Sequence, residues 1–383
     1  MNTFKKASLT FALLSFFIAC SESPSSETAI KQIIKEVGQQ YIPDSRLEVY
    51  AIEVYPSHNN WVLKGTTSNV KAKKALLKQV QKVTNKTPID SIRLLPDQNT
   101  LGDKIYGVVN LSVCNMRKTN QFTSSMESQG LLGMPVQVLQ KNDWYQIQTP
   151  DHYIGWVHRT AIVPMNAKEI LSWKEAPKVI VTAHYGFTYQ EANTKSQTVS
   201  DIVSGDRLIY EGTKGKFYVV SYPDGKKAFL PLADGMTEKE WKTTLKQDSQ
   251  SILETAYTLM GIPYLWAGAS SKGVDCSGFV RICTYLHGID LPRDASQLAE
   301  IGQRINIAPD FSNLRPADLL FFGHKATTDH GPKVVHVAFY IGDKKFIHSQ
   351  GYVHISSFDP NDPLYDKANL NRLLFAGRIF KDK

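Results

Sequence analysis

A cysteine and two histidines in the last third of the chain have the residue types and the spacing of a nucleophilic site. Cys276 lies in the run VDCSGFV (274–280), where a Gly-containing loop leads into a predicted helix. His336 opens the alternating strand pattern HVAFYIG, and His348 follows twelve residues later in KFIHSQG, after a turn. A cysteine can act as nucleophile, one histidine as its base, and a further group can orient that base. The pattern therefore predicts a cysteine hydrolase.

Each of these residues needs an element that holds it in place. The start of a helix presents free backbone N–H groups and the positive end of the helix dipole, so we expect the pKa of Cys276 to lie below the ~8.5 of a free thiol. Histidines on the two strands of a hairpin can approach each other, and a helix packed on that sheet can bring Cys276 to His336. The backbone N–H at the helix start, together with Tyr264, is expected to stabilise an oxyanion.

The wider context of Cys276 resembles the NlpC/p60 family of cell-wall cysteine peptidases. The motif Asp-Cys-Ser-Gly-Phe is preceded by GIPYLWAG and followed by histidines 60 and 72 residues after the cysteine, within roughly residues 247–383. The resemblance implies an α+β, papain-like domain in which Cys276 is the nucleophile, His336 the base and then the acid, and His348 the residue that orients His336. It also implies attack on an amide carbonyl, an acyl-enzyme, and hydrolysis of that intermediate by water.

Two stretches upstream of this domain are typical of small β-barrels. Short strands with Gly turns between about 106 and 162 resemble bacterial SH3-like domains, and residues 178–234 repeat the pattern more weakly. Two such barrels before the peptidase domain resemble the γ-D-glutamyl-L-diamino acid endopeptidases (YkfC-like). That resemblance implies a murein peptide, L-Ala-γ-D-Glu-diamino acid, which is cut after D-Glu and whose free N-terminal ammonium is held by acidic residues and a tyrosine.

The resemblance also implies which residues form the substrate pocket. Asp275 is the acid that matches directly, and Glu127 and Tyr153 in the first barrel are candidates for the second acid and the tyrosine. Other roles stay open: Asp275 as a helix N-cap, Glu127 as a solvated loop acid, and Arg293 and Asp294 as partners of each other. The further residues expected in the cleft are Tyr264, Trp266, Ser277, Arg293, Asp294 and Ser296.

A pocket for a free ammonium would restrict the substrate, because a buried carboxylate without its cation is costly. In intact wall that Ala is joined to muramic acid, so we expect action on released peptides during turnover or recycling. Two alternatives remain open. One is an endopeptidase that cuts the polymer itself, and the other is a non-catalytic, wall-binding lipoprotein.

The first twenty residues resemble a bacterial lipoprotein signal. Lys5 and Lys6 precede an apolar run (9–18), which is shorter than the ~20 residues that span a bilayer. The run ends at Ala19-Cys20, before the polar stretch SESPSSE. Cys20 is therefore the expected lipid anchor of an exported protein in the cell envelope, periplasmic or anchored to the outer membrane. An ordinary signal peptide is the alternative.

Composition and charge exclude several other classes. The chain has 383 residues, 42% of them hydrophobic and 21% charged, which is ordinary for globular proteins of two to four domains. Four cysteines are too few for a disulfide scaffold, and Cys114 and Cys283 are expected in the core. The net charge of +8 is not gathered in one basic stripe, so no nucleic-acid partner is expected. No cofactor signature occurs, and His324 and His330 lack the flanking spacing of a metal site.

We therefore expect a monomer of several domains whose partners are murein peptides and, through the lipid, a membrane. The small N-terminal α/β unit should run helix, two strands, helix, strand, and its lysine-rich second helix (70–83) is expected to be a solvated face. In the peptidase domain a helix should bury Ile252, Ala256, Leu259 and Met260 on one side. The expected divisions are 1–20 for the signal, 21–100 for the α/β unit, 101–168 and 169–245 for the two SH3-like barrels, and 246–383 for the peptidase domain.

Overall fold

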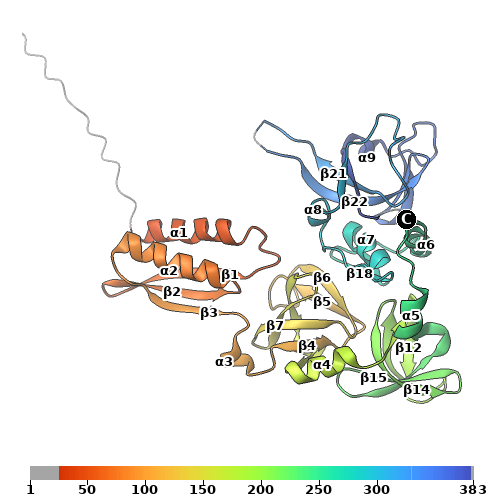
Figure 1. Cartoon of the computed structure of the whole chain (residues 1–383), viewed down its shortest axis with the longest axis horizontal. Helices are drawn as coiled ribbons and strands as arrows, with labels where there is room; N and C mark the ends of the chain where they lie inside the picture. The colour runs from red at the N-terminus through yellow and green to blue at the C-terminus, as the bar shows by residue number, and fades with distance from the viewer. Residues whose placement is uncertain (1–25, 329, 381–383) are drawn as a thin grey trace, which may run out of the picture.

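The computed structural model describes residues 26–328 and 330–380. Cys20 and the rest of the predicted signal lie outside these residues. Four larger sheets follow one another along the described chain, and Figure 1 shows the N-terminal unit projecting from the other three. No helix within the described residues is both long and apolar enough to cross a membrane.

The N-terminal unit is a three-stranded sheet packed by two helices that contact each other. β1 (Tyr50–Ser57) and β2 (Asn60–Thr67) form an antiparallel hairpin, and β3 (Ile89–Leu94) joins β2 in parallel. α1 (Ser26–Tyr41) and α2 (Val70–Thr84) bury their apolar stripes in one core with the sheet. The order of these elements is the one that the hydrophobic periodicity predicts.

The second unit is an antiparallel sheet of seven strands in the order β10-β4-β7-β8-β9-β5-β6. β10 and β6 stand at the two ends of this order and, within the described residues, do not pair with each other. The sheet is therefore not the closed barrel that the sequence suggests. Cys114 is fully buried in its core, as expected. The strands are β4 (Tyr106–Val109), β5 (Val113–Arg117), β6 (Met126–Leu131), β7 (Pro135–Lys141), β8 (Trp144–Gln148), β9 (Ile154–His158) and β10 (Ile162–Met165). Short helical elements flank them: α3 (Gln98–Leu101), η1 (Arg159–Ala161) and α4 (Ala167–Glu175).

The third unit repeats the topology of the second. Its order is β13-β12-β16-β15-β14-β11-β17. When the strands of each sheet are numbered from 1 to 7 along the chain, both sheets have the order 7-1-4-5-6-2-3, read from β10 in the second unit and from β17 in the third. The weak sequence repeat therefore corresponds to a repeated strand order, again without closure among the described strands. The strands are β11 (Lys178–Val181), β12 (Tyr185–Tyr189), β13 (Thr198–Val203), β14 (Arg207–Lys214), β15 (Phe217–Ser221), β16 (Lys227–Pro231) and β17 (Gly235–Thr237), with η2 (Leu232–Asp234) and α5 (Glu238–Thr244).

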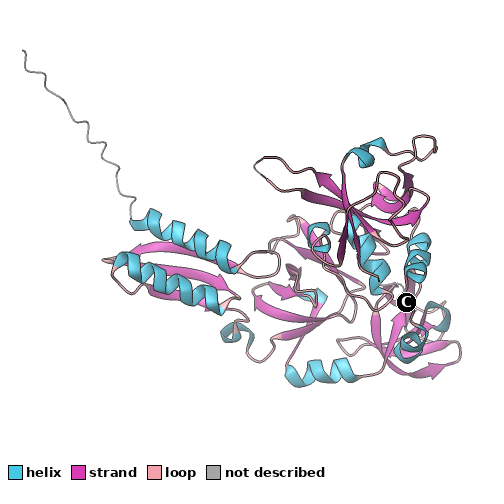
Figure 2. Ribbon diagram, turned by 45° about the horizontal axis from the view of Figure 1, so that its top comes forward, coloured by secondary structure: helices cyan, strands magenta, loops and turns pink. Residues whose placement is uncertain are grey.

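The C-terminal unit is a six-stranded antiparallel sheet, β20-β25-β21-β22-β23-β24, with helix α7 (Cys276–Tyr285) packed on β22 and β23. The sequence patterns predicted four of the strands but neither β20 nor β24. Figure 2 shows helices of this unit both above and below its strands. The strands are β20 (Gln303–Ile305), β21 (Leu319–His324), β22 (Lys333–Gly342), β23 (Lys345–Gln350), β24 (Tyr352–Ser357) and β25 (Leu373–Arg378). The remaining elements are α6 (Ser249–Thr258), α8 (Ala295–Leu298), α9 (Lys367–Asn371) and the small hairpin β18 (Ala269–Ser270) with β19 (Gly273–Val274).

One predicted core position of this unit is wrong. Ile252, Ala256 and Leu259 are fully buried, as expected, but the side chain of Met260 is 43% exposed. α6 ends at Thr258, so Met260 lies beyond the last helical turn and no longer shares its buried face.

Candidate active site

Cys276 is the first residue of α7, and the turn before it is tightly packed. Asp275 is the N-cap, and its Oδ1 accepts a hydrogen bond from the backbone N–H of Gly278 at 2.7 Å. A Cβ at position 278 would overlap the carbonyl oxygen of Gly268, which explains the glycine of the Asp-Cys-Ser-Gly motif. The start of the helix is thus fixed against the preceding loop, with Cys276 at its N-terminus.

His336 and His348 lie on neighbouring strands, as predicted, and their side chains meet. Phe339 of β22 pairs with Ile347 of β23, so the two histidines share one face of the sheet, two residues out of direct register. The Nε2 of His336 lies 2.8 Å from the Nδ1 of His348, and the Nε2 of His348 lies 3.2 Å from the Oγ of Ser356. Both histidines are buried, so this chain of contacts holds their rings in fixed orientations.

Ser356 lies on β24, a strand that the sequence analysis did not predict. The alternation of YVHISS directly after the Gly351 turn is the signal that would have found it. The third strand of this meander therefore supplies a hydroxyl to the second histidine.

The thiol of Cys276 lies against the strand that carries His336. Burial, followed by the negative charge of Asp275, raises the pKa of Cys276 to about 11, although the backbone N–H groups of Val337 and Ser277 act in the opposite direction. Val337 directly follows His336, so the thiol lies beside the part of β22 that carries this histidine. The expectation of a lowered thiol pKa is wrong, since the helix start is more deeply buried than its position in the sequence suggests.

The two histidines are shifted toward their neutral forms. Burial, with a smaller contribution from the positive charge of Arg372, lowers the pKa of His336 to about 3. Burial and the neighbouring His336 lower the pKa of His348 to about 2. At neutral pH the resting site therefore holds a protonated thiol and two neutral imidazoles.

Tyr264 and Trp266 lie on the loop that precedes Cys276. The backbone N–H of Tyr264 donates to the carbonyl oxygen of Gly351 at 2.8 Å, which ties this loop to the turn between β23 and β24. Burial and the nearby Cys276 raise the pKa of Tyr264 to about 12, so its hydroxyl keeps its proton at neutral pH. The side chain of Trp266 is 68% exposed and thus forms an outer part of this loop.

Asp275 already has a cation of its own. The guanidinium of Arg293, which is 1% exposed, donates from Nη1 to Oδ1 at 3.1 Å and from Nη2 to Oδ2 at 2.7 Å. The same Nη1 donates to the Oγ of Ser277 at 3.0 Å. The expectation that Asp275 receives a substrate ammonium is therefore not supported, because both of its oxygens are used inside the protein.

Asp294, rather than Asp275, is the acid that lies beside Tyr153. The hydroxyl of Tyr153 donates to the Oδ2 of Asp294 at 3.2 Å. The same oxygen accepts from the Nη1 of Arg46 at 2.6 Å, and that Nη1 also donates to the Oγ of Ser296 at 3.0 Å. The alternative in which Arg293 pairs with Asp294 is wrong, since each has a different partner.

Tyr153 and Glu127 reach this region from the second unit. Burial and the charge of Asp294 raise the pKa of Tyr153, and the charge of Glu127 contributes in the same direction. Glu127 is partly exposed on β6 and accepts a hydrogen bond from Ser125 at 2.9 Å. The loop that carries Tyr153 is tied to α7 by the nearly buried ion pair between Asp151 and Arg281, at 3.2 Å.

The sequence analysis missed the contribution of the N-terminal unit. Arg46 lies in the loop between α1 and β1, in a unit for which the sequence analysis names no site residue. The carboxylate of Asp44 accepts hydrogen bonds from the same guanidinium, from Nε at 2.8 Å and from Nη2 at 2.7 Å. Nothing in the stretch PDSR (43–46) distinguishes it from an ordinary turn, so only the tertiary structure brings these residues to Asp294.

Two family models match the chain: the NlpC/P60 family over residues 261–372 and the bacterial dipeptidyl-peptidase SH3 domain over residues 116–162. A γ-D-glutamyl-L-lysine dipeptidyl-peptidase from Bacillus cereus is 32% identical over 236 residues, which cover 59% of this chain and 68% of the relative. The chain belongs to the NlpC/P60 family. It is therefore a peptidase, and thus a hydrolase.

The likeness of this NlpC/P60 peptidase to known proteins extends beyond its C-terminal unit. A γ-D-glutamyl-L-lysine dipeptidyl-peptidase from Bacillus subtilis is 25% identical over 233 residues, covering 58% of this chain and 72% of the relative. The crystal structure of an NlpC/P60 family protein from Bacillus cereus superposes with a TM-score of 0.60 at 25% identity, over 71% of this chain and 99% of that one. An NlpC/P60 endopeptidase from Photobacterium damselae shares the fold at 14% identity, with a TM-score of 0.53 over 91% of this chain and 90% of that one.

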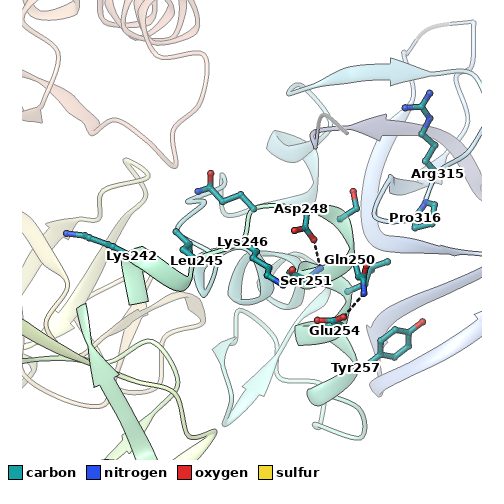
Figure 3. A pocket seen from close by; sticks show the side chains of 13 residues that line it. Lys242, Leu245, Lys246, Asp248, Gln250, Ser251, Glu254, Tyr257, Arg315 and Pro316 are labelled. Carbon is teal, nitrogen blue, oxygen red and sulfur yellow. Dashed lines mark hydrogen bonds between the residues drawn. The ribbon is translucent and has the colours of Figure 1, made fainter. Parts of the chain in front are cut away.

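Two other features of the NlpC/P60 peptidase lie apart from Cys276. Among the described residues no group of three or more His, Cys, Asp or Glu side chains is arranged to hold a metal ion, and His324 and His330 are exposed. A groove of about 1320 Å³ lies where α5 leads into α6, and Figure 3 shows Lys242 and Arg315 at its two ends. Its lining contains none of the residues that surround Cys276.

Proposed function

We propose that this NlpC/P60 peptidase hydrolyses the amide bond between γ-D-Glu and an L-diamino acid (diaminopimelate or Lys) in murein peptides that carry a free N-terminal L-Ala. The observation that carries the proposal is the hydrogen bond from Tyr153 of the SH3-type unit to Asp294 of the peptidase unit, and the charge of Glu127 acts on the same tyrosine. The two Bacillus relatives, whose names specify a γ-D-glutamyl-L-lysine bond, support the same class of substrate.

Cys276 is the proposed nucleophile and His336 its base. His348 contacts the Nε2 of His336, so Nδ1 is the ring nitrogen left to serve the thiol. As the sulfur attacks the amide carbonyl, its proton passes to His336. The C–N bond then breaks, His336 returns the proton to the leaving amine, and a thioester remains on Cys276. Water attacks this thioester with His336 again as base, which releases L-Ala-γ-D-Glu and restores the thiol.

The order of the pKa values supports proton transfer during the attack rather than a preformed ion pair. The pKa of Cys276 is raised to about 11 and that of His336 is lowered to about 3, so a thiolate–imidazolium pair is the less stable state before substrate binds. The developing oxyanion would be stabilised by the backbone N–H at the start of α7 and by the protonated hydroxyl of Tyr264.

The substrate's ammonium is proposed to bind at Asp294, Tyr153 and Glu127. A carboxylate that is partly removed from water gains most from a ligand of opposite charge, and a tyrosine hydroxyl adds direction. Intact wall has no free amine at this Ala, so we propose a role in cell-wall turnover or recycling. The proposed location in the cell envelope rests on the sequence around Cys20, and loss of lipid labelling in Cys20→Ser would test it.

The decisive experiment compares L-Ala-γ-D-Glu-diaminopimelate with its N-acetylated form. We expect release of L-Ala-γ-D-Glu only from the free amine, detected by mass spectrometry, and no release by Cys276→Ala. Equal hydrolysis of the two peptides would remove the ammonium pocket, and full activity of Cys276→Ala would remove the nucleophile. Release of fragments from intact sacculi would favour an enzyme that acts on the polymer.

A further inference from the structure

The loop between α1 and β1 is fastened to the first seven-stranded sheet beside Tyr153. The backbone N–H of Ile154 donates to the carbonyl oxygen of Arg46 at 2.9 Å, and the Nε2 of Gln148 donates to the carbonyl oxygen of Leu47 at 2.9 Å. Within the loop, the backbone N–H of Leu47 donates to the carbonyl oxygen of Asp44 at 3.1 Å. The backbone at Arg46 is therefore fixed next to the residue that follows Tyr153.

The side chain of Arg46 is oriented as firmly as its backbone. Asp44 binds two of its nitrogens, and the Nε2 of Gln297 donates to the Oδ2 of Asp44 at 2.8 Å. This arrangement leaves Nη1 free to point at the peptidase unit, where it contacts the Oδ2 of Asp294 at 2.6 Å and the Oγ of Ser296 at 3.0 Å. The side chains of Arg46 and Asp294 are 35% and 28% exposed, so the pair borders solvent and a ligand can reach it.

The surroundings of this Nη1 are those that an alkylammonium would need. A carboxylate oxygen and a serine hydroxyl lie within hydrogen-bond distance of the nitrogen, and the hydroxyl of Tyr153 shares the same carboxylate oxygen. A single oxygen of Asp294 cannot give its best contact to two cations at once. A bound ammonium and Arg46 therefore compete for the same place.

We propose that Arg46 is a specificity-determining residue that competes with the substrate's ammonium for Asp294. This inference rests on the proposed function, because it takes a free amino group to be the substrate's anchor. A free-amine peptide displaces Nη1 from Asp294 while Asp44 retains the rest of the guanidinium. An N-acylated peptide brings no cation to this subsite, so it gains no ionic contact with Asp294 whether or not Arg46 is present. The N-terminal unit thereby sets how strongly the enzyme binds free amino termini.

The test is Arg46→Ala, assayed on the free and N-acetylated forms of L-Ala-γ-D-Glu-diaminopimelate. We expect KM for the free-amine peptide to fall about three- to five-fold, the size that a partly exposed ion pair supports, with kcat unchanged because Arg46 does not contact Cys276. Hydrolysis of the N-acetylated peptide should not improve. Arg46→Lys, which keeps the cation, should stay close to the wild type.

Arg93→Ala is the matched control. It removes another arginine side chain from the same unit, where Arg93 is paired with Asp97. The KM of this variant should equal that of the wild type. If Arg46→Ala melts at a lower temperature than the wild type, Arg46→Gln is assayed in its place. This variant keeps N–H donors but no charge, and the same fall in KM is expected. An unchanged or higher KM in a folded, neutral variant at position 46 would overturn the inference.

Binding of the product separates this inference from the proposed function. Calorimetry with the dipeptide L-Ala-γ-D-Glu needs no turnover, so it can be carried out in Cys276→Ala with and without Arg46→Ala. We expect the Kd to fall about three- to five-fold on loss of Arg46. If the wild type cleaves neither peptide, the proposed function fails, and the calorimetric comparison still decides whether Arg46 competes with the ammonium. An unchanged Kd overturns this competition alone.

Discussion

Arg293 binds Asp275 through both of its terminal nitrogens, at 3.1 and 2.7 Å, directly beside Cys276. Such a planar, two-point pair fixes the carboxylate in direction as well as in charge. The same Asp275 Oδ1 caps α7 at Gly278, so one buried ion pair holds the turn that presents the thiol.

Loss of this ion pair is expected to destabilise the fold. Arg293→Ala leaves the nearly buried carboxylate of Asp275 without its cation, which costs about 3–5 kcal/mol in the free energy of unfolding. Chemical denaturation measures the change, and kcat should fall with it because the first turn of α7 loosens. Arg378→Ala breaks another ion pair in the same unit, in which Asp318 is buried and Arg378 is partly exposed. It should lose stability but keep kcat, and a normal kcat in Arg293→Ala would contradict the role of the pair.

His348 and Ser356 should have unequal effects on turnover. His348→Ala leaves His336 without the partner that orients it, so we expect kcat to fall about 10²–10⁴-fold with KM nearly unchanged. Ser356→Ala removes only the hydroxyl 3.2 Å from His348 and should lower kcat by less than about ten-fold. Steady-state kinetics on the free-amine peptide distinguishes them. An effect of Ser356→Ala as large as that of His348→Ala would contradict the proposed order of the chain.

Stability should decrease in mildly acidic solution because of His336. Its pKa is lowered from about 6.5 to about 3 by burial, so between these pH values the unfolded chain binds a proton that the folded chain does not. The free energy of unfolding therefore falls as the pH falls through this window. Urea unfolding at several pH values should give a shallower dependence for His336→Asn. His58→Asn, in an exposed hairpin turn, should keep the wild-type slope, and equal slopes for all three proteins would refute the account.

Alkylation of the free enzyme should report the raised pKa of Cys276. Only the thiolate reacts, so the rate with iodoacetamide should rise about ten-fold per pH unit from pH 7 upward, toward the pKa of about 11. Cys114 and Cys283 are fully buried and should remain unlabelled in the folded protein. Peptide mass mapping identifies the labelled residue. A fast rate that does not depend on pH around neutrality would instead indicate a thiolate at rest.

Local patterns predicted the positions of the candidate catalytic residues on their helix and strands, but they did not predict how deeply these residues are buried. The Asp-Cys-Ser-Gly motif and the alternating strands located Cys276, His336 and His348, because each depends on its own helix start or strand. The direction of the thiol pKa was wrong because burial is decided by packing between α7 and β22, which no local pattern encodes.

Contacts between distant segments were the least predictable part of the site. Asp275 and Arg293 are 18 residues apart and Arg46 and Asp294 are 248 apart, so charge and spacing alone did not identify either pair. Met260 failed for a more local reason, since the periodicity of α6 gives no sign that the helix ends at Thr258.

The fastening of Arg46 and Leu47 to the first seven-stranded sheet has a consequence for how this enzyme is dissected. A fragment that starts near residue 100 would retain Cys276, both histidines, Glu127, Tyr153 and Asp294, and would look like a complete minimal peptidase. It would nevertheless lack one charged wall of the amine subsite. By the competition described above, such a fragment is a different catalyst with its own substrate preference, and its kinetics would not stand for those of the full chain.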